Sequence, residues 1–385
     1  MMRPILVLLL VSCGGSDGKG KKRGSTTSSA VDTAGCTKCD RSFDVTDAER
    51  LLGAAACRTI TGDLIIKPDD SVTDLSALAC LESVDGEVVI DADELTDLSG
   101  LEALERVGSL TIRANRNLAS LSGLDTLERV EQTLRIADNP TLGSISALSA
   151  LKFVGNTIAI ERNLVLADLD GLSTMTLAGW IVIDDNDALT ALSGLAGLTF
   201  VQGDLTLTNN ASLTDLSGLS GVYEVDYNLT VRGNAALTSL AGLSAIETVG
   251  WGLQIEDNEA LTSLAGLDEL EQVGGALSIR GNANLLGVEG MPGLVGVGDS
   301  LTVASNARLA NIDGLVGLET VGTDLEITDN ASLTSVDAIT SLESVGSDVR
   351  ITDNASLCQS AAELAAAVVQ ASGSKVVENN DGDCP

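Results

Sequence analysis

The chain has 385 residues, a formal net charge of −33, only 2% aromatic residues and no histidine. This acidity excludes nucleic acid as a partner, because binding it requires cations that neutralise phosphates. The lack of histidine removes the usual general base and the commonest metal ligand. With so few aromatic residues, we expect a core of branched aliphatic side chains, and we expect no metal ion and no cofactor.

The first residues predict a signal for secretion. Residues 5–10 form an apolar run that is too short to span a bilayer, and residues 1–12 are typical of a signal peptide. The stretch Leu10-Val11-Ser12-Cys13 resembles the lipobox of bacterial lipoproteins, which implies that Cys13 carries a lipid and that the membrane is a partner. Gly14 after it implies sorting to the outer membrane. The alternative is an ordinary signal peptide with an incidental cysteine.

Residues 13–35 follow as a tether of Gly, Ser, Thr, Lys and Asp with almost no apolar residue. Such a composition is typical of a flexible linker. We therefore expect a folded body held away from the membrane, which starts near residue 36.

An asparagine then recurs at a fixed interval through most of the chain. Nine of the ten intervals are 24 residues and one is 23, and the series is Asn115, Asn139, Asn163, Asn186, Asn210, Asn234, Asn258, Asn282, Asn306, Asn330 and Asn354. A period in this range indicates stacked repeats. Asparagine amides form hydrogen-bonded ladders along stacked strands, so we interpret the series as a corner ladder.

Each repeat carries aliphatic residues spaced by two, which suits a strand, and by three, which suits corners. No stretch carries a helical stripe of ten residues. A glycine column, including Gly242 and Gly266, marks a second corner. The pattern predicts an all-β fold: a right-handed parallel β-solenoid of about thirteen 24-residue turns over residues 62–357, with short helical caps at both ends.

The repeat phrases also carry a family resemblance. Leu237-Thr238-Ser239-Leu240-Ala241-Gly242-Leu243, followed by Ile246-Glu247-Thr248-Val249 and Leu253-Gln254-Ile255, resembles receptor L-domain repeats, a leucine-rich-repeat-like family. The resemblance covers about residues 62–385 and implies this fold. It implies a binding role without naming a ligand, because no ligand-contact motif of the family is found in this sequence.

The array needs covers for its apolar ends. In the N-terminal cap, residues 36–61, Thr46-Asp47-Ala48-Glu49 fits a capping box and predicts a short helix. In the C-terminal cap, residues 358–385, residues 360–371 predict a second helix.

Six cysteines remain besides Cys13, an even number that suits disulfides in an oxidising compartment. Cys57 and Cys80 have nearly the same register in adjacent turns, so we expect them to pair. Cys358 and Cys384 bracket the C-terminal cap and are expected to pair, which leaves Cys36 with Cys39. The alternative is a zinc site formed by the first four cysteines.

Two surfaces are candidates for binding. The first consists of the outward positions of the short strands, which hold Thr, a few acids and half of the cations of the array; its candidate residues are Arg113, Arg135, Arg232, Arg280 and Arg350. Exposed strands favour Thr and Arg in any case, so a purely structural role is the alternative. The second is a stack of Tyr227 on Trp251, which either anchors a sugar or protein or fills a widened corner.

Two further hypotheses concern acids. The run Asp184-Asp185-Asn186-Asp187 and the pair Asp91 and Asp93 supply oxygens for a weak calcium site, but without a known loop spacing we expect solvated acids. A polysaccharide-acting β-helix enzyme is disfavoured because the acids are spread along columns. We predict a non-catalytic, lipid-anchored envelope or surface protein that binds a protein or glycan. The alternative is a passive envelope spacer.

Overall fold

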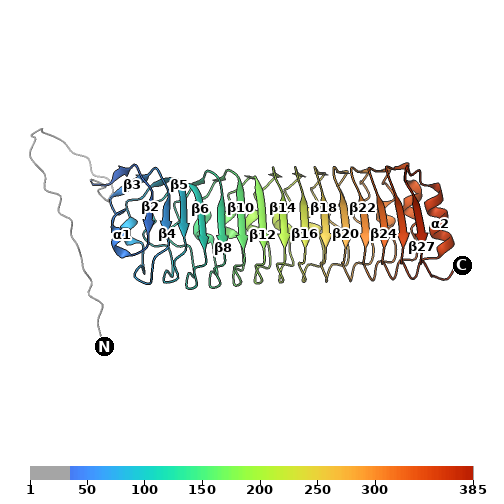
Figure 1. The fold of residues 1–385 in the computed structure, drawn as a ribbon, viewed down its shortest axis with the longest axis horizontal. Helices are drawn as coiled ribbons and strands as arrows, with labels where there is room; N and C mark the ends of the chain where they lie inside the picture. The colour runs from blue at the N-terminus through green and yellow to red at the C-terminus, as the bar shows by residue number, and fades with distance from the viewer. Residues whose placement is uncertain (1–34, 385) are drawn as a thin grey trace, which may run out of the picture.

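The computed structural model describes residues 35–384. In it the chain winds into one long solenoid, with α1 (Ala48–Leu52) at one end and α2 (Gln359–Val368) at the other (Figure 1). The predicted signal peptide, Cys13 and almost all of the predicted tether lie outside the described residues.

One long parallel face runs the length of the molecule, and each turn adds a strand to it. Thirteen strands from β4 to β26 match the thirteen expected turns, and β2 and β27 extend the face at its two ends. Its strands are β2 (Phe43–Val45), β4 (Leu64–Ile66), β5 (Ser83–Ile90), β6 (Arg106–Arg113), β8 (Leu134–Ala137), β10 (Thr157–Glu161), β12 (Trp180–Asp184), β14 (Leu205–Thr208), β16 (Leu229–Arg232), β18 (Leu253–Glu256), β20 (Leu277–Arg280), β22 (Leu301–Ala304), β24 (Leu325–Thr328), β26 (Val349–Thr352) and β27 (Lys375–Glu378).

A second parallel face, made of shorter strands, precedes the first in each turn. β5 and β6 run through both faces without a break, pairing with β3 or β7 early and with β4 or β8 late. The remaining strands of this face are β1 (Thr37–Cys39), β3 (Cys57–Ile60), β7 (Arg129–Val130), β9 (Phe153–Val154), β11 (Leu177–Ala178), β13 (Phe200–Val201), β15 (Glu224–Val225), β17 (Thr248–Val249), β19 (Gln272–Val273), β21 (Gly296–Val297), β23 (Thr320–Val321) and β25 (Ser344–Val345).

Short 3₁₀ segments form the corner opposite the long face in many turns. They are η1 (Ser76–Leu78), η2 (Ser146–Ala150), η3 (Asp170–Leu172), η4 (Ser193–Leu195), η5 (Ser217–Leu219), η6 (Ala241–Leu243), η7 (Asp313–Leu315) and η8 (Asp337–Ser341). The glycine column lies here, and crowding explains it: a Cβ on Gly242 would lie 2.0 Å from the backbone of Leu216 in the turn below.

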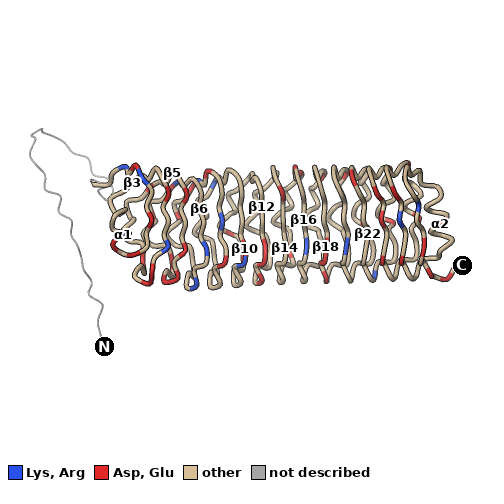
Figure 2. The backbone as a smooth tube through the Cα atoms, viewed as in Figure 1, with Lys and Arg blue, Asp and Glu red and all other residues tan. Residues whose placement is uncertain are grey.

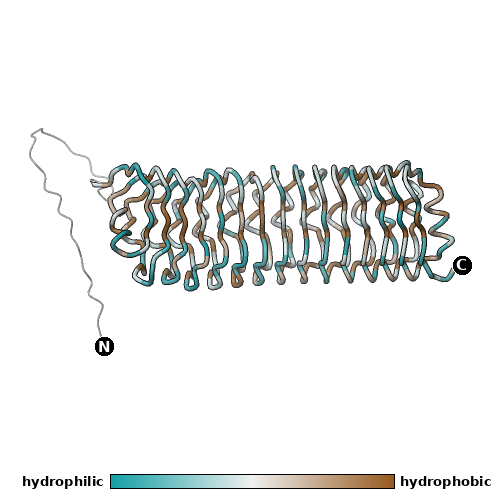
Figure 3. The backbone as a smooth tube through the Cα atoms, in the orientation of Figure 1, coloured by the Kyte–Doolittle hydropathy of each residue, from teal (hydrophilic) through white to brown (hydrophobic). Residues whose placement is uncertain are grey.

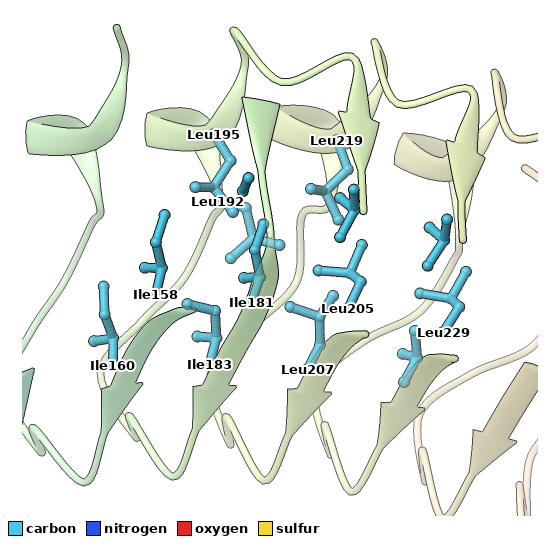
Figure 4. Close-up of a cluster of buried hydrophobic side chains, with 14 of the residues drawn as sticks. Ile158, Ile160, Ile181, Ile183, Leu192, Leu195, Leu205, Leu207, Leu219 and Leu229 are labelled. Carbon is cyan, nitrogen blue, oxygen red and sulfur yellow. The ribbon is translucent and has the colours of Figure 1, made fainter. Parts of the chain in front are cut away.

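Aliphatic side chains fill the interior in columns. Ile158 and Ile160 of β10 lie beside Ile181 and Ile183 of β12, and the leucines of β14 continue the two rows (Figure 4). These side chains are essentially inaccessible to solvent. Figure 3 shows hydrophobic residues recurring at matching places in successive turns. The parallel β-solenoid predicted from the sequence is therefore confirmed.

The asparagine series is a buried ladder at the end of the long face. In a middle turn, the Asn234 backbone N–H and Nδ2 donate to Oδ1 of Asn258 at 3.1 and 3.4 Å. Nδ2 also donates to the Leu207 carbonyl at 2.9 Å, and Oδ1 accepts two hydrogen bonds from Asn210. Every ladder asparagine from residue 115 to 354 is fully buried.

The ladder contains two features that the sequence analysis missed. Asn380, which follows Asn354 by 26 residues, accepts hydrogen bonds from it and forms a twelfth rung. The residue before each rung also has a left-handed backbone, as in Asp138, Asn209 and Gly233. Asp, Asn and Gly tolerate that conformation best, so their frequency just before the rungs was the available signal.

The helical caps differ slightly from expectation. α1 begins one residue late, since Asp47 rather than Thr46 is the N-cap and accepts a hydrogen bond from the Arg50 N–H at 2.9 Å. This bond holds the pKa of Asp47 below its usual range. α2 ends at Val368, and the chain then adds β27, whose Lys375 donates to the Ala366 carbonyl at the helix C-terminus.

The pairing of the first four cysteines was predicted wrongly. The disulfides join Cys36 to Cys80 and Cys39 to Cys57, with Cα–Cα distances of 6.0 and 5.6 Å. The reason is that the chain around Cys39 forms β1, which pairs with β3 and brings Cys39 to Cys57. Three residues of strand span roughly 10 Å, too far for a bond between Cys36 and Cys39.

These two bonds occupy all four sulfurs, so the alternative zinc site is also wrong. At the other end, Cys358 pairs with Cys384 at a Cα–Cα distance of 5.0 Å, as expected, and closes the C-terminal cap.

Candidate functional site

The long face presents the predicted arginines in register. Arg113, Arg232 and Arg280 end their strands, while Arg135 and Arg350 lie in the middle of theirs. Parallel pairing without a shift keeps all five on the outer surface of the face. The face is less exposed than its composition predicted, because close stacking buries three of its threonines: Thr111, Thr328 and Thr352.

Neighbouring acids already pair with three of these arginines. Arg135 donates to Glu161 on the strand of the adjacent turn at 2.6 Å, and Arg232 lies 3.3 Å from Asp257. Arg113 shares Asp91 with Lys67. Within residues 35–384, Arg280 and Arg350 have no ion pair. Figure 2 accordingly shows both signs of charge along the solenoid rather than one basic patch.

A further pair lies at the corner beside this face. Arg162 donates to Asp138 at 2.6 Å, and this hydrogen bond holds the pKa of the Asp138 carboxyl below its usual range. The same contact raises the pKa of Arg162. The face therefore compensates its own charges, which fits the structural alternative for its arginines.

The two predicted aromatic residues form an exposed stack. The rings of Tyr227 and Trp251 have centroids 6.2 Å apart and planes inclined by 10°. The Tyr227 residue is 44% exposed and Trp251 is 61% exposed. They do not fill the interior of a corner, so that alternative is wrong. Both lie where the second face turns into the long face.

A third ring joins this row, and the sequence analysis missed it. Trp180 lies 6.3 Å from Tyr227, although a whole turn separates them. The intervening position is Gly203, where a Cβ would lie 2.6 Å from the Trp180 ring, so the ring covers the glycine. Trp180 and Tyr227 therefore meet only because the residue between them has no side chain.

More apolar side chains adjoin the row on the second face. Phe200 stacks on Tyr223 at 6.1 Å, and Leu177 is the register partner of Phe200. Leu177 and Tyr223 are more than 40% exposed. The following residues are termed the aromatic patch: Leu177, Trp180, Phe200, Tyr223, Tyr227 and Trp251.

The patch begins at a shortened turn of the array. Val154 and Ile158 are four residues apart in one turn, but the equivalent Ala178 and Ile181 are three apart, which explains the single 23-residue interval. A pocket of about 190 Å³ lies here, lined in part by Phe153, Leu177 and Gln202. The shortened turn was visible in the sequence as a signal, but its consequence was not.

The polar surroundings of the patch are acidic and amidic. The four segments that carry it, residues 176–180, 199–204, 222–228 and 246–252, contain Asp204, Glu224, Asp226 and Glu247 but no Lys or Arg. Asp204 Oδ1 accepts from Asn228 Nδ2 at 2.9 Å, and Asn228 Oδ1 accepts from the Gly252 N–H. The rings thus lie beside fixed hydrogen-bond acceptors.

Two of the acids considered for calcium are engaged otherwise. Asp184 Oδ1 accepts from Thr208 and Asn209, and Asp93 Oδ1 accepts from the Arg116 N–H. Asn186 belongs to the buried ladder. Within residues 35–384, no group of three or more His, Cys, Asp or Glu is placed to hold a metal ion. The same part of the chain has no helix long and apolar enough to cross a membrane.

Comparisons with known proteins add little beyond these observations. No family model matches the sequence, and no curated protein matches it. Among solved structures, the chain is similar to the functional domain of InlJ from Listeria monocytogenes, which includes a cysteine ladder. The identity is 15% and the TM-score 0.28, over 80% of this chain and 70% of that one.

A second similar structure is TLR13 in complex with ssRNA13, at 14% identity and a TM-score of 0.17, over 90% of this chain and 74% of that one. At these scores neither likeness supports an argument about function. The functional argument rests on the surface of this chain.

Proposed function

We propose that this protein is a non-catalytic binding protein of the cell envelope, in which the solenoid serves as a rigid support for a ligand-binding patch. The observation that carries the proposal is the aromatic patch. All but one of the seven aromatic residues of the chain lie between residues 153 and 251, and four of these six are exposed at the corner or on the adjoining second face. Exposed Trp and Tyr dominate the energetic centres of binding surfaces.

The regular remainder of the molecule supports this assignment. Outside the patch, successive turns repeat the same aliphatic core and ladder, which stacking alone explains. A departure from the repeat that exposes apolar surface is unfavourable for solubility, so a binding role accounts for it. The paired arginines of the long face make that face the weaker candidate.

Location outside the cytoplasm is part of the same proposal. Three disulfides favour an oxidising compartment. The lipid anchor at Cys13, the outer-membrane location and membership of the receptor L-domain family remain predictions from the sequence. Labelling of cells with radioactive palmitate tests the anchor. We expect the label to be incorporated into the protein, and we expect Cys13→Ala to abolish this incorporation.

The binding function is tested with the full-length protein immobilised and exposed to an envelope extract that contains proteins and polysaccharides. We expect retention of a component that is lost with the combined W180A, Y227A and W251A substitutions. The matched surface variant combines R113E, R135E, R232E and R280E, and we expect it to retain the component. If no component is retained by any form, the protein is a passive spacer and the proposal is wrong.

A further inference from the structure

We infer that the aromatic patch binds an uncharged, hydroxyl-rich carbohydrate chain that lies along the solenoid axis over Trp180, Tyr227 and Trp251. This inference rests on the proposed binding function and names the class of ligand. Its grounds are the arrangement of the rings, the groups beside them, the pocket at one end and the charge of the surface.

The rings form a row rather than a cluster. Trp180 and Tyr227 have centroids 6.3 Å apart, and Tyr227 and Trp251 have centroids 6.2 Å apart. Trp180 and Trp251 belong to positions three turns apart, a span of roughly 14 Å at the usual strand spacing. A linear chain of a few sugar rings covers such a row. The electron-rich ring faces attract the polarised C–H groups that sugars present.

The groups beside the rings suit hydroxyl donors. Asp204, Glu224 and Asp226 are partly exposed, and Asp204 is held in place through its hydrogen bond from Asn228. Carboxylates accept strong hydrogen bonds from hydroxyl groups. Gln202, which lines the pocket, is exposed and offers both an acceptor and donors.

The charge of the surface excludes acidic ligands. No Lys or Arg lies in the four segments that carry the patch, and the whole chain has a net charge of −33. Lys152, at the edge of the pocket, pairs with Glu128 at 2.8 Å. An anionic polysaccharide or a phosphate group therefore lacks a counter-charge at this site.

The size of the site favours a sugar chain over a protein. The pocket of about 190 Å³, lined by Leu177 and Gly179 among others, is smaller than the roughly 300–1,000 Å³ of pockets for drug-sized ligands. A stable protein interface needs about 800 Å² on each partner. The patch extends over only four turns, from Leu177 to Trp251.

The chain provides its own reporter for a test. Both of its tryptophans, Trp180 and Trp251, lie in the patch, so the tryptophan fluorescence of the full-length protein reports on this site alone. We expect saturable changes of this fluorescence on titration with at least one of dextran, mixed-linkage β-glucan or mannan. We expect no change with polygalacturonate at the same ionic strength.

Affinity electrophoresis in gels that contain the same polysaccharides tests the residues. W251A is expected to weaken binding about tenfold or more, as at other aromatic binding centres. W251F, which keeps a flat ring, is expected to retain most of it. V316S changes an equally exposed apolar side chain outside the patch and is expected to leave binding unchanged. Circular dichroism establishes that each variant is folded.

The inference is overturned if none of the neutral polysaccharides changes the fluorescence, or if W251A binds as well as V316S. Periodate treatment of the envelope extract, which destroys sugars, separates this inference from the proposed function. A component that still binds in a Trp251-dependent manner after treatment is a protein; the proposed function then stands and the carbohydrate inference fails. Absence of any bound component in the untreated extract refutes the proposed function itself.

Discussion

The asparagine ladder and the aromatic patch belong to the same array of repeats but differ in regularity and in exposure to solvent. The ladder is identical in turn after turn, fully buried and saturated with hydrogen bonds. The patch occurs in a few turns only, is largely exposed, and begins at a shortened turn. In a repeat protein, uniform columns maintain the stack, whereas local departures from them are free to serve a ligand. The following experiments test that division, from the largest expected effect to the smallest.

The largest effect is expected in the middle of the ladder. Asn234→Ala removes the acceptor of the Asn210 N–H and the donor to the Leu207 carbonyl, both buried. Leaving such groups unsatisfied costs about 1–3 kcal/mol each, so we expect a loss of roughly 3–5 kcal/mol in the free energy of unfolding. Urea unfolding followed by circular dichroism measures it.

Asn284→Ala is the matched control, because Asn284 makes only exposed hydrogen bonds: it donates to the Glu259 carbonyl and accepts from Arg308. We expect a change within about 0.5 kcal/mol for it. Equal midpoints for the two variants would show that the ladder does not stabilise the stack.

The glycine corner is expected to show the next largest effect. Gly242→Ala places a Cβ 2.0 Å from the Leu216 backbone, whereas Gly143→Ala places one with no atom within 4 Å. Forcing a methyl group into a packed site costs about 1–3 kcal/mol. At Gly143 the alanine meets no clash and restricts the conformations of the unfolded chain, so we expect the free energy of unfolding to rise by about 0.4–1 kcal/mol. Thermal unfolding of both variants measures the difference, and the opposite order would contradict the crowding explanation.

The patch is expected to matter little for stability. Trp251→Ala changes a side chain on a residue that is 61% exposed, so we expect the free energy of unfolding to change by about 0.5 kcal/mol or less. Ligand binding is expected to fall in the same variant. Comparison of the urea unfolding midpoints of Trp251→Ala and Asn234→Ala tests whether the patch contributes to stability. If Trp251→Ala destabilises the protein as strongly, the patch belongs to the structural framework and the division fails.

The smallest effect concerns pH. Arg162 lowers the pKa of Asp138 in the folded protein, so the pair contributes stability above the unfolded pKa, about 3.9, and loses it as the pH falls through the folded pKa. Asp138 has a left-handed backbone, which asparagine also tolerates, so Asp138→Asn removes only the contribution of the charge. We expect a melting temperature slightly below that of the wild type at pH 7, corresponding to about 1 kcal/mol or less.

At acid pH below the folded pKa, the two proteins are expected to melt together. Measurement of melting temperatures between pH 2 and 8 checks this convergence. A constant difference across the whole range would attribute the effect to packing rather than to the ion pair.

Regularity explains what the sequence analysis predicted well. The 24-residue asparagine interval and the aliphatic spacing within each turn are local patterns, and every copy reinforces the same register. The fold class, the number of turns and the buried ladder follow from them. Asn380 was missed because the intervening cap helix lengthens its interval to 26 residues.

The candidate site was only partly predictable. Tyr227 and Trp251 are 24 residues apart, so the period alone placed their rings together. Trp180 is three turns from Trp251 and reaches Tyr227 only across Gly203, a contact that no interval encodes. The ion pairs of the long face could not be predicted from the sequence either, because an arginine pairs with an acid only if its side chain reaches across neighbouring strands.

The sequence by itself thus determined the stacking: the period, the inward aliphatic columns and the ladder. Tertiary structure alone decided the disulfide pairs, since an added strand beside β3 brings Cys39 to Cys57. It also decided which exposed rings meet. Repetition transmits a local preference from turn to turn, whereas contacts at ends and irregular turns depend on distances in space that a period does not specify.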